Sequence, residues 1–151
     1  MPRKDITSFN VSGNLKTALE NAGFENETRP ESGRAFYNGT ANIRLLCLEQ
    51  PANIEGLRTI KISNNTPDFD FVDFSDPTVT RFWTIRELEI FVGTRIPGVQ
   101  ASESTLSGTT WTHVIQVNDV DYTATDTKQV DAMAKALRAY LQANAQQLRQ
   151  G

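Results

Sequence analysis

The C-terminal part of the chain carries the clearest helical pattern of apolar and polar positions. Between residues 127 and 149, apolar side chains recur three or four residues apart, as on one face of an amphipathic helix. Asp126 precedes this stretch and Gln129 follows three residues later, which is the spacing of a capping box. The pattern predicts a long C-terminal helix whose apolar stripe consists of Val130, Met133, Leu137, Tyr140 or Leu141, and Leu148.

A second, shorter helix is predicted near the N-terminus, at about residues 13–22. Ser12 precedes it as a candidate N-cap, and Gly23 follows it, where glycine readily takes the left-handed conformation that ends a helix. Residues 1–11 are polar, and we interpret them as a loose arm or an edge strand. The apolar positions that define this helix are Leu15, Ala18, Leu19 and Ala22.

Alternating apolar and polar residues predict several strands in the first half of the chain. The dipeptide Asn38-Gly39 favours a tight hairpin between the first two, because both residues tolerate positive φ. The expected strands lie at about residues 34–37, 40–49 and 57–63, with a further short strand within 68–76.

The clearest strand pattern covers Thr109 to Val117. Asn118-Asp119 is then expected to turn the chain, so that residues 120–123 return as an antiparallel partner. One face of the longer strand would carry Trp111, His113, Ile115 and Val117.

Two segments between these regions are harder to interpret. Residues 78–92 begin with β-favouring side chains and fit one sheet face, so we predict a strand. A helix over residues 77–89 is the rival interpretation, because its apolar residues also recur at helical spacing. Residues 93–108 contain glycine, proline and many small polar residues, which predicts the longest loop of the chain.

Together these elements predict one α+β domain over residues 1–151. We expect an antiparallel sheet of about five to seven strands. The long C-terminal helix would cover one face of that sheet, with the short N-terminal helix nearby. A chain of 151 residues is long enough to bury a core without disulfides, and Cys47, the only cysteine, lies in an apolar run that suits burial.

Composition and charge narrow the classes of function. The chain has 15 basic and 18 acidic residues, a net charge of -3, which makes nucleic-acid binding an unfavoured hypothesis. It has neither an apolar run of the roughly 20 residues that span a membrane nor a signal peptide. We therefore expect a soluble, cytoplasmic protein without a membrane partner.

Acidic residues alternate with phenylalanines between residues 68 and 76. Carboxylates two residues apart on a strand point to the same side, so Asp68 and Asp70 could share a divalent cation. The run lacks the spacing of a calcium loop, and solvated acids on a strand anchored by phenylalanines are the favoured interpretation. The candidate binding residues from this region are Asp68, Asp70 and Asp73, with Asp76 completing the run.

His113 is the only histidine, and its place among alternating apolar residues favours a structural role over that of a catalytic base. The sequence contains neither a Gly-x-Ser-x-Gly elbow nor a glycine-rich phosphate loop, so no cofactor is expected.

Two classes of function remain. The first is a non-enzymatic interaction or assembly protein, expected to be a subunit of a homomeric complex. A viral structural component, located in the virion, is one protein of this class. Its partner would be a second copy, contacted through Tyr140, Leu141 and Leu148 on the long helix. The second is a binder of a small ligand, metal or nucleic acid, or an enzyme, that uses Asp68, Asp70 and Asp73 with His113 or a residue of 93–108.

Overall fold

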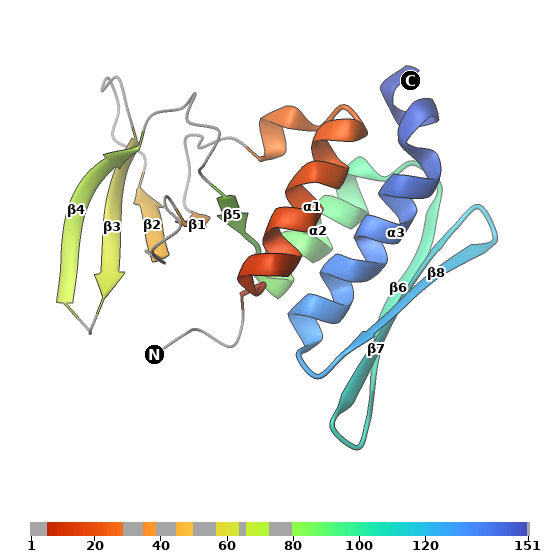
Figure 1. The fold of residues 1–151 in the computed structure, drawn as a ribbon. Coiled ribbons are helices and arrows are strands. Elements are labelled where there is room, and N and C mark those ends of the chain that lie inside the picture. Colours follow the sequence, from red (N-terminus) through yellow and green to blue (C-terminus); the bar gives the residue numbers. More distant parts are fainter. Residues whose placement is uncertain are drawn as a thin grey trace.

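The computed structural model describes residues 6–28, 35–38, 45–49, 57–63, 66–72 and 80–150. Within these ranges the chain forms helices and two antiparallel sheets, and the helices stand between the sheets (Figure 1). The helices are α1 (Phe9–Asn21), the 3₁₀ helix η1 (Glu25–Glu27), α2 (Ile85–Arg95) and α3 (Gln129–Gln150). One sheet has the strand order β4-β3-β2-β1-β5 and the other the order β6-β7-β8.

The three-stranded sheet consists of β6 (Val99–Ser107), β7 (Thr110–Val117) and β8 (Val120–Asp126). The prediction of a strand over 109–117 and a returning partner is confirmed, and the partner continues three residues further than expected. Asn118 and Asp119 form the turn with φ of 50° and 67°, the left-handed conformation that a two-residue hairpin of this kind requires. This hairpin carries His113 and Ile115 toward the core.

The long C-terminal helix is also confirmed. Its start is held by Asp126, whose Oδ1 accepts a hydrogen bond from the backbone N–H of Lys128 at 3.2 Å. Burial alone would raise the pKa of Asp126, but the contact with Lys135 Nζ, 2.7 Å from Oδ2, and the backbone hydrogen bonds lower it overall. The reciprocal contact expected from Gln129 stays a prediction.

The apolar stripe of α3 lies in one hydrophobic core together with α1, α2 and the inner face of β7. α3 covers the three-stranded sheet, as predicted for the C-terminal helix (Figure 1). Burial of such side chains stabilises a fold by about 1.5–3 kcal/mol each. The core members from α3 include Val130, Met133, Leu137, Tyr140 and Leu141.

The N-terminal helix begins earlier than predicted, at Phe9. Ser8 is its extended N-cap residue, and the Ser8 backbone N–H donates to Asp131 Oδ1 at 2.8 Å. Ile6 is buried and forms an isolated bridge with Thr84. Residues 6–11 therefore belong to the fold and are not a loose arm, while residues 1–5 lie outside the described residues. Ser12, expected as the cap, instead lies inside the helix with its hydroxyl 2.6 Å from that of Thr7.

The prediction of a strand over residues 78–92 is wrong beyond its first part. Of residues 80–92, β5 (Thr80–Phe82) is a strand and Thr84 is extended, and α2 follows directly. The helix starts at Thr84 because its hydroxyl accepts from the Glu87 N–H at 3.1 Å while Glu87 Oε1 accepts from the Thr84 N–H at 2.9 Å. This capping box, absent from our reading of the sequence, outweighs the β preference of the preceding residues.

The prediction of a loop over residues 93–108 is also wrong. α2 extends to Arg95, and after a short turn at Gly98, where φ is 79°, the chain forms β6. Most of the side chains of β6 are exposed, so the strand shows little of the apolar alternation by which buried strands are recognised. Pairing with β7 holds it in the sheet.

The five-stranded sheet contains the strands expected in the first half of the chain: β1 (Ala35–Asn38), β2 (Leu45–Glu49), β3 (Leu57–Ser63) and β4 (Thr66–Val72). β1 and β2 pair antiparallel, with Asn38 opposite Leu45, so residues 39–44 connect them and the two-residue Asn-Gly hairpin is not formed. The predicted single sheet of five to seven strands is not confirmed, because the described strands divide between two sheets. The α+β class and the helix-covered antiparallel sheet are present.

Candidate functional site

The inner face of β6 and β7 carries a polar cluster around His113. Ser104 lies opposite His113 in the register, and Ser102 lies opposite Ile115 on the same face. Ser102 Oγ is 2.8 Å from His113 Nε2, and Ser104 Oγ is 2.7 Å from His113 Nδ1. Both ring nitrogens are thus engaged by hydroxyls of a single neighbouring strand.

Ser102, His113 and Ser104 form a hydrogen-bonded trio whose hydrogen atoms can be counted. A neutral imidazole has one N–H donor and one bare nitrogen acceptor. The serine at the bare nitrogen must donate its hydroxyl hydrogen to the ring, whereas the serine at the N–H accepts from it. The second serine therefore keeps a hydroxyl hydrogen for another partner, so the trio can still donate one hydrogen bond.

Desolvation keeps the ring neutral. His113 is only 2% exposed, and burial lowers its pKa below the ordinary value of 6.5 because removal from water disfavours the charged form. An imidazolium at this site would lack a carboxylate among its hydrogen-bond partners, which are both hydroxyls. The trio is therefore uncharged at neutral pH.

The trio borders a cleft of about 480 Å³ between α2 and β6. Glu89, Val92 and Gly93 form the α2 wall, at the i, i+3 and i+4 spacing of one helix face. Gly93 has no side chain, and a Cβ added there would meet nothing within 4 Å. The remaining lining comes from β6, His113 and the first residue of α3: Val99, Gln100, Ala101, Ser102, Ser104, His113 and Gln129.

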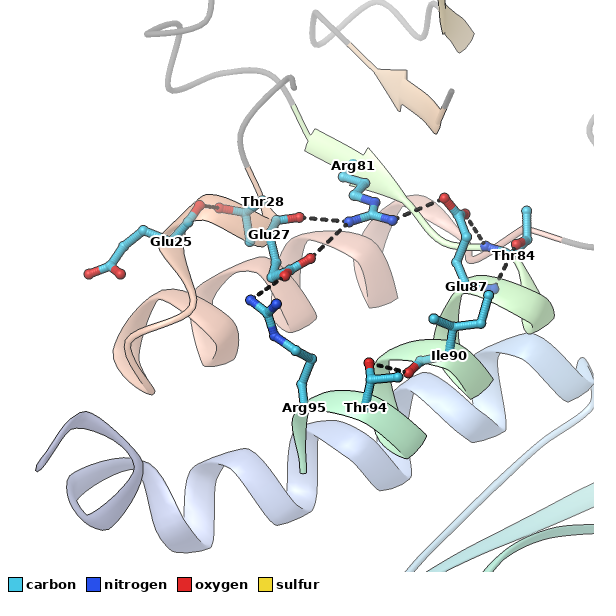
Figure 2. Close-up of polar contacts among 9 residues, drawn as sticks. All are labelled: Glu25, Glu27, Thr28, Arg81, Thr84, Glu87, Ile90, Thr94 and Arg95. Atoms are coloured by element: carbon cyan, nitrogen blue, oxygen red, sulfur yellow. Dashed lines mark hydrogen bonds and ion pairs between the residues drawn. The ribbon is translucent and has the colours of Figure 1, made fainter. Parts of the chain in front are cut away.

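A second polar cluster, centred on Arg81, lies along a different side of α2 from the cleft (Figure 2). Arg81 Nη2 is 3.0 Å from Glu87 Oε2, and Arg81 Nη1 donates to the backbone carbonyl of Glu27 at 2.9 Å. Glu27 Oε1 in turn lies 2.6 Å from Nη2 of Arg95. The cluster joins η1, β5 and both ends of α2, which are far apart along the chain.

Arg81 also stacks on an aromatic ring. Its Cζ lies 3.6 Å from the centre of the Trp83 ring, a cation–π arrangement. Arg81 Nε is buried without a hydrogen-bond partner among the described residues. The carboxylates and the carbonyl occupy the two terminal nitrogens, so the cluster offers little capacity for a ligand, and we assign it a structural role.

The structure separates the two sets of candidate binding residues. Asp68 and Asp70 lie in β4, opposite Lys61 and Thr59 in the register, in a different sheet from His113. Asp73 and Asp76 lie outside the described residues. The predicted combination of the acidic run with His113 is therefore not brought together by the described strands, whereas His113 does meet two residues of the 93–108 segment.

The predicted interface residues lie on the inner side of α3. Tyr140 and Leu141 are buried in the core of the chain itself, and Leu148 is partly buried against it. Tyr140 packs edge-on against Tyr122, with ring centres 5.3 Å apart. This packing explains their apolar character without a second subunit, so these three residues are not available as an exposed patch.

The described part of the chain contains neither a group of three potential metal-ligating His, Cys, Asp or Glu side chains nor a helix with the length and apolarity needed to cross a membrane.

The sequence does not single out Ser102, Ser104 or Glu89 as site residues, because its pattern predicts a loop around the two serines and a strand at Glu89. The available signal was the spacing of Ser102 and Ser104, two residues apart, which on a strand places both hydroxyls on one face.

The outer side of the three-stranded sheet differs from the inner side. Thr105, Thr112 and Thr125 form one row across β6, β7 and β8, next to the row that contains His113.

Among the described strands β6 pairs only with β7, so the other backbone edge of its nine residues is unpaired there. Glu103 is the only charged residue of β6, and the strand contains no proline.

Comparison with protein-family models, with curated proteins and with solved structures found no match for this chain.

Proposed function

We propose that the protein is a non-enzymatic assembly subunit that associates with further copies of itself through the edge of β6. The observation that carries the proposal is the long β6 edge, which pairs with no other described strand. An open edge presents backbone N–H and C=O groups that can continue the sheet into another chain. Proteins that stay monomeric commonly protect such edges with charged residues, proline, β-bulges or very short strands. β6 has neither lysine nor proline, its register irregularity lies at its start, between Val99 and Ala101, and Glu103 is its single charge.

A second copy is the partner that this edge fits most simply. Two identical strands can pair antiparallel about a two-fold axis, which satisfies both edges at once and closes the assembly as a dimer. An axis at Glu103 would place two carboxylates opposite each other, which is unfavourable. An axis at Ser104 places Glu103 opposite Thr105 of the other copy, so like charges no longer face each other.

The test is the mass of the native protein in solution, by native mass spectrometry and by light scattering after size exclusion. We expect a dimer for the unchanged chain. Thr105→Glu places a second carboxylate on β6, opposite Glu103 of the partner, and should weaken association at least about tenfold, equivalent to about 1.4 kcal/mol.

Thr125→Glu is the matched control, because Thr125 occupies the same row on β8, two strands away. It should leave the dimer intact. A chain that is monomeric at about 100 μM, far above a micromolar dissociation constant, would contradict the proposal. Equal weakening by both substitutions would exclude the β6 edge as the interface.

A further inference from the structure

We infer that the cleft between α2 and β6 is a binding site for a small organic cation. In this arrangement Glu89 supplies the countercharge, the Ser102–His113–Ser104 trio supplies hydrogen bonds, and Val92 and Val99 contact the carbon skeleton. The inference is independent of self-association, since it concerns the inner side of β6 and not its backbone edge.

The size of the cleft is that of a small-ligand site, and its lining is half polar. A volume of about 480 Å³ falls within the roughly 300–1,000 Å³ of small-molecule pockets. Such pockets combine apolar walls with a few placed polar groups. Here the apolar wall comes from two valines, and the polar groups are hydroxyls, side-chain amides and one carboxylate.

The charge of the lining selects a cation. Among the described residues that border the cleft, Glu89 is the only acidic one, and none is a lysine or an arginine. The neutral His113 adds no opposing charge. An ammonium group that enters therefore meets one unneutralised carboxylate of the lining together with serine oxygens that can accept hydrogen bonds.

Two features of the cleft favour an anion: the spare hydroxyl hydrogen of the trio, which is uncharged, and the N-terminus of α3. Gln129, its first residue, borders the cleft, and helix N-termini carry partial positive charge. Asp126 already occupies this end of the helix, because its carboxylate accepts the Lys128 N–H. The partial positive charge at the N-terminus of α3 is therefore compensated by Asp126, and Glu89 sets the charge of the cleft.

Gly93 is an exposed residue on the α2 wall of the cleft. The structure has room for a side chain at this position, since an added Cβ meets nothing within 4 Å. A large side chain at Gly93 would project into the cleft, which provides a way to block it without disturbing the backbone.

The experiment uses the single histidine as its reporter. In the full ¹⁵N-labelled chain at about pH 7.5, where carboxylates are ionised, the imidazole nitrogens give one set of signals because His113 is the only histidine. We would titrate n-butylammonium chloride, n-butanol and sodium butyrate at constant ionic strength. We expect a saturable shift of the His113 signals with n-butylammonium alone, with a midpoint on the order of 1 mM.

Two matched pairs of variants locate the site. Glu89→Gln should weaken n-butylammonium binding at least about tenfold, whereas Glu20→Gln, the same change on α1, should not. Gly93→Leu should abolish the shift, whereas Gly13→Leu, where an added Cβ also meets nothing within 4 Å, should preserve it.

The amide spectrum of each variant reports whether it folds, and the Glu89→Gln pair carries the test if Gly93→Leu does not. The inference is overturned if n-butylammonium gives no saturable shift. It is also overturned if n-butanol or butyrate shifts the His113 signals equally, or if Glu89→Gln binds as the unchanged chain does.

Discussion

The two polar clusters on different sides of α2 show how differently a protein can use buried polar groups. The Arg81 cluster is charged, and its terminal nitrogens already have carboxylate or carbonyl partners (Figure 2). The His113 trio is neutral, and it keeps one hydroxyl hydrogen that the ring does not use. The first cluster borders a smaller hollow of about 250 Å³, and the second borders the larger cleft of about 480 Å³.

The difference separates stability from binding. The Arg81 cluster joins β5, α2 and η1, so its interactions are available only in the folded chain and hold distant segments together. The His113 trio joins two strands that backbone hydrogen bonds already pair, so its polar groups add less to the fold. We therefore expect the largest losses of stability at Arg81 and the clearest pH response at His113.

The largest expected effect is at Arg81. Arg81→Met keeps an unbranched side chain near Trp83 but leaves Glu27 and Glu87 without their shared cation. Loss of one partner from a buried ion pair costs several kcal/mol, and the partial exposure of these groups reduces that figure. We expect the free energy of unfolding to fall by about 2–3 kcal/mol, measured by urea denaturation.

Arg86→Met provides the comparison, because Arg86 is an exposed residue of the same helix. It should change the free energy of unfolding by no more than about 0.5 kcal/mol. Equal losses at Arg81 and Arg86 would contradict a structural role for the cluster.

The next effect concerns pH and His113. Because burial lowers the pKa of His113 in the folded chain, the unfolded chain binds a proton first as the pH falls. Stability is therefore complete above about pH 6.5 and falls as the pH drops from there toward the lower folded pKa. The slope approaches about 1.4 kcal/mol per pH unit at most.

His113→Gln should remove this slope, since no other histidine is present. The carboxyl of Asp126, whose folded pKa is also lowered, loses its contribution only at more acidic pH, below about 4. Urea denaturation between about pH 7.5 and pH 5 therefore isolates the histidine. A slope that persists in the variant would show that the buried ring is not its source.

The smallest effect is at the start of α2. Thr84→Ala removes the hydroxyl that accepts the Glu87 N–H and should cost about 1 kcal/mol, the usual effect of losing an N-cap. Thr94→Ala, at an exposed position near the other end of the helix, should change stability by less than about 0.5 kcal/mol. Thermal unfolding of the two variants makes the comparison, and a loss at Thr94 as large as that at Thr84 would argue against the cap.

The elements that were predicted correctly are those in which local pattern and burial agree. α3 has an uninterrupted apolar stripe, and β7 alternates cleanly because its inner residues His113, Ile115 and Val117 are buried. The predictions were wrong in segments whose local residue preferences differ from the structure that tertiary contacts impose. The residues before Thr84 favour a strand, although the capping box at Thr84 and Glu87 starts a helix directly after them. β6 lacks apolar alternation because most of its side chains face water.

The candidate site could be predicted only in part. The position of His113 on an inner sheet face followed from its period-two neighbours, and the structure places it there. Its partners Ser102 and Ser104 do not follow from the sequence, because only the pairing of β6 with β7 brings them to the ring. The role of Glu89 could not be predicted from the sequence, because it depends on α2 being a helix. In that helix Glu89 lies one turn from Gly93.

The single helix α2 links the two regions mechanically. Its eleven residues form a rod of about 16 Å, anchored at its first turn by Thr84 and Glu87. Glu89 and Gly93, further along the same rod, form one wall of the cleft. Ion pairs of Glu87 and Arg95 hold both ends of this rod, so contacts that do not involve His113 fix the position of the wall beside it.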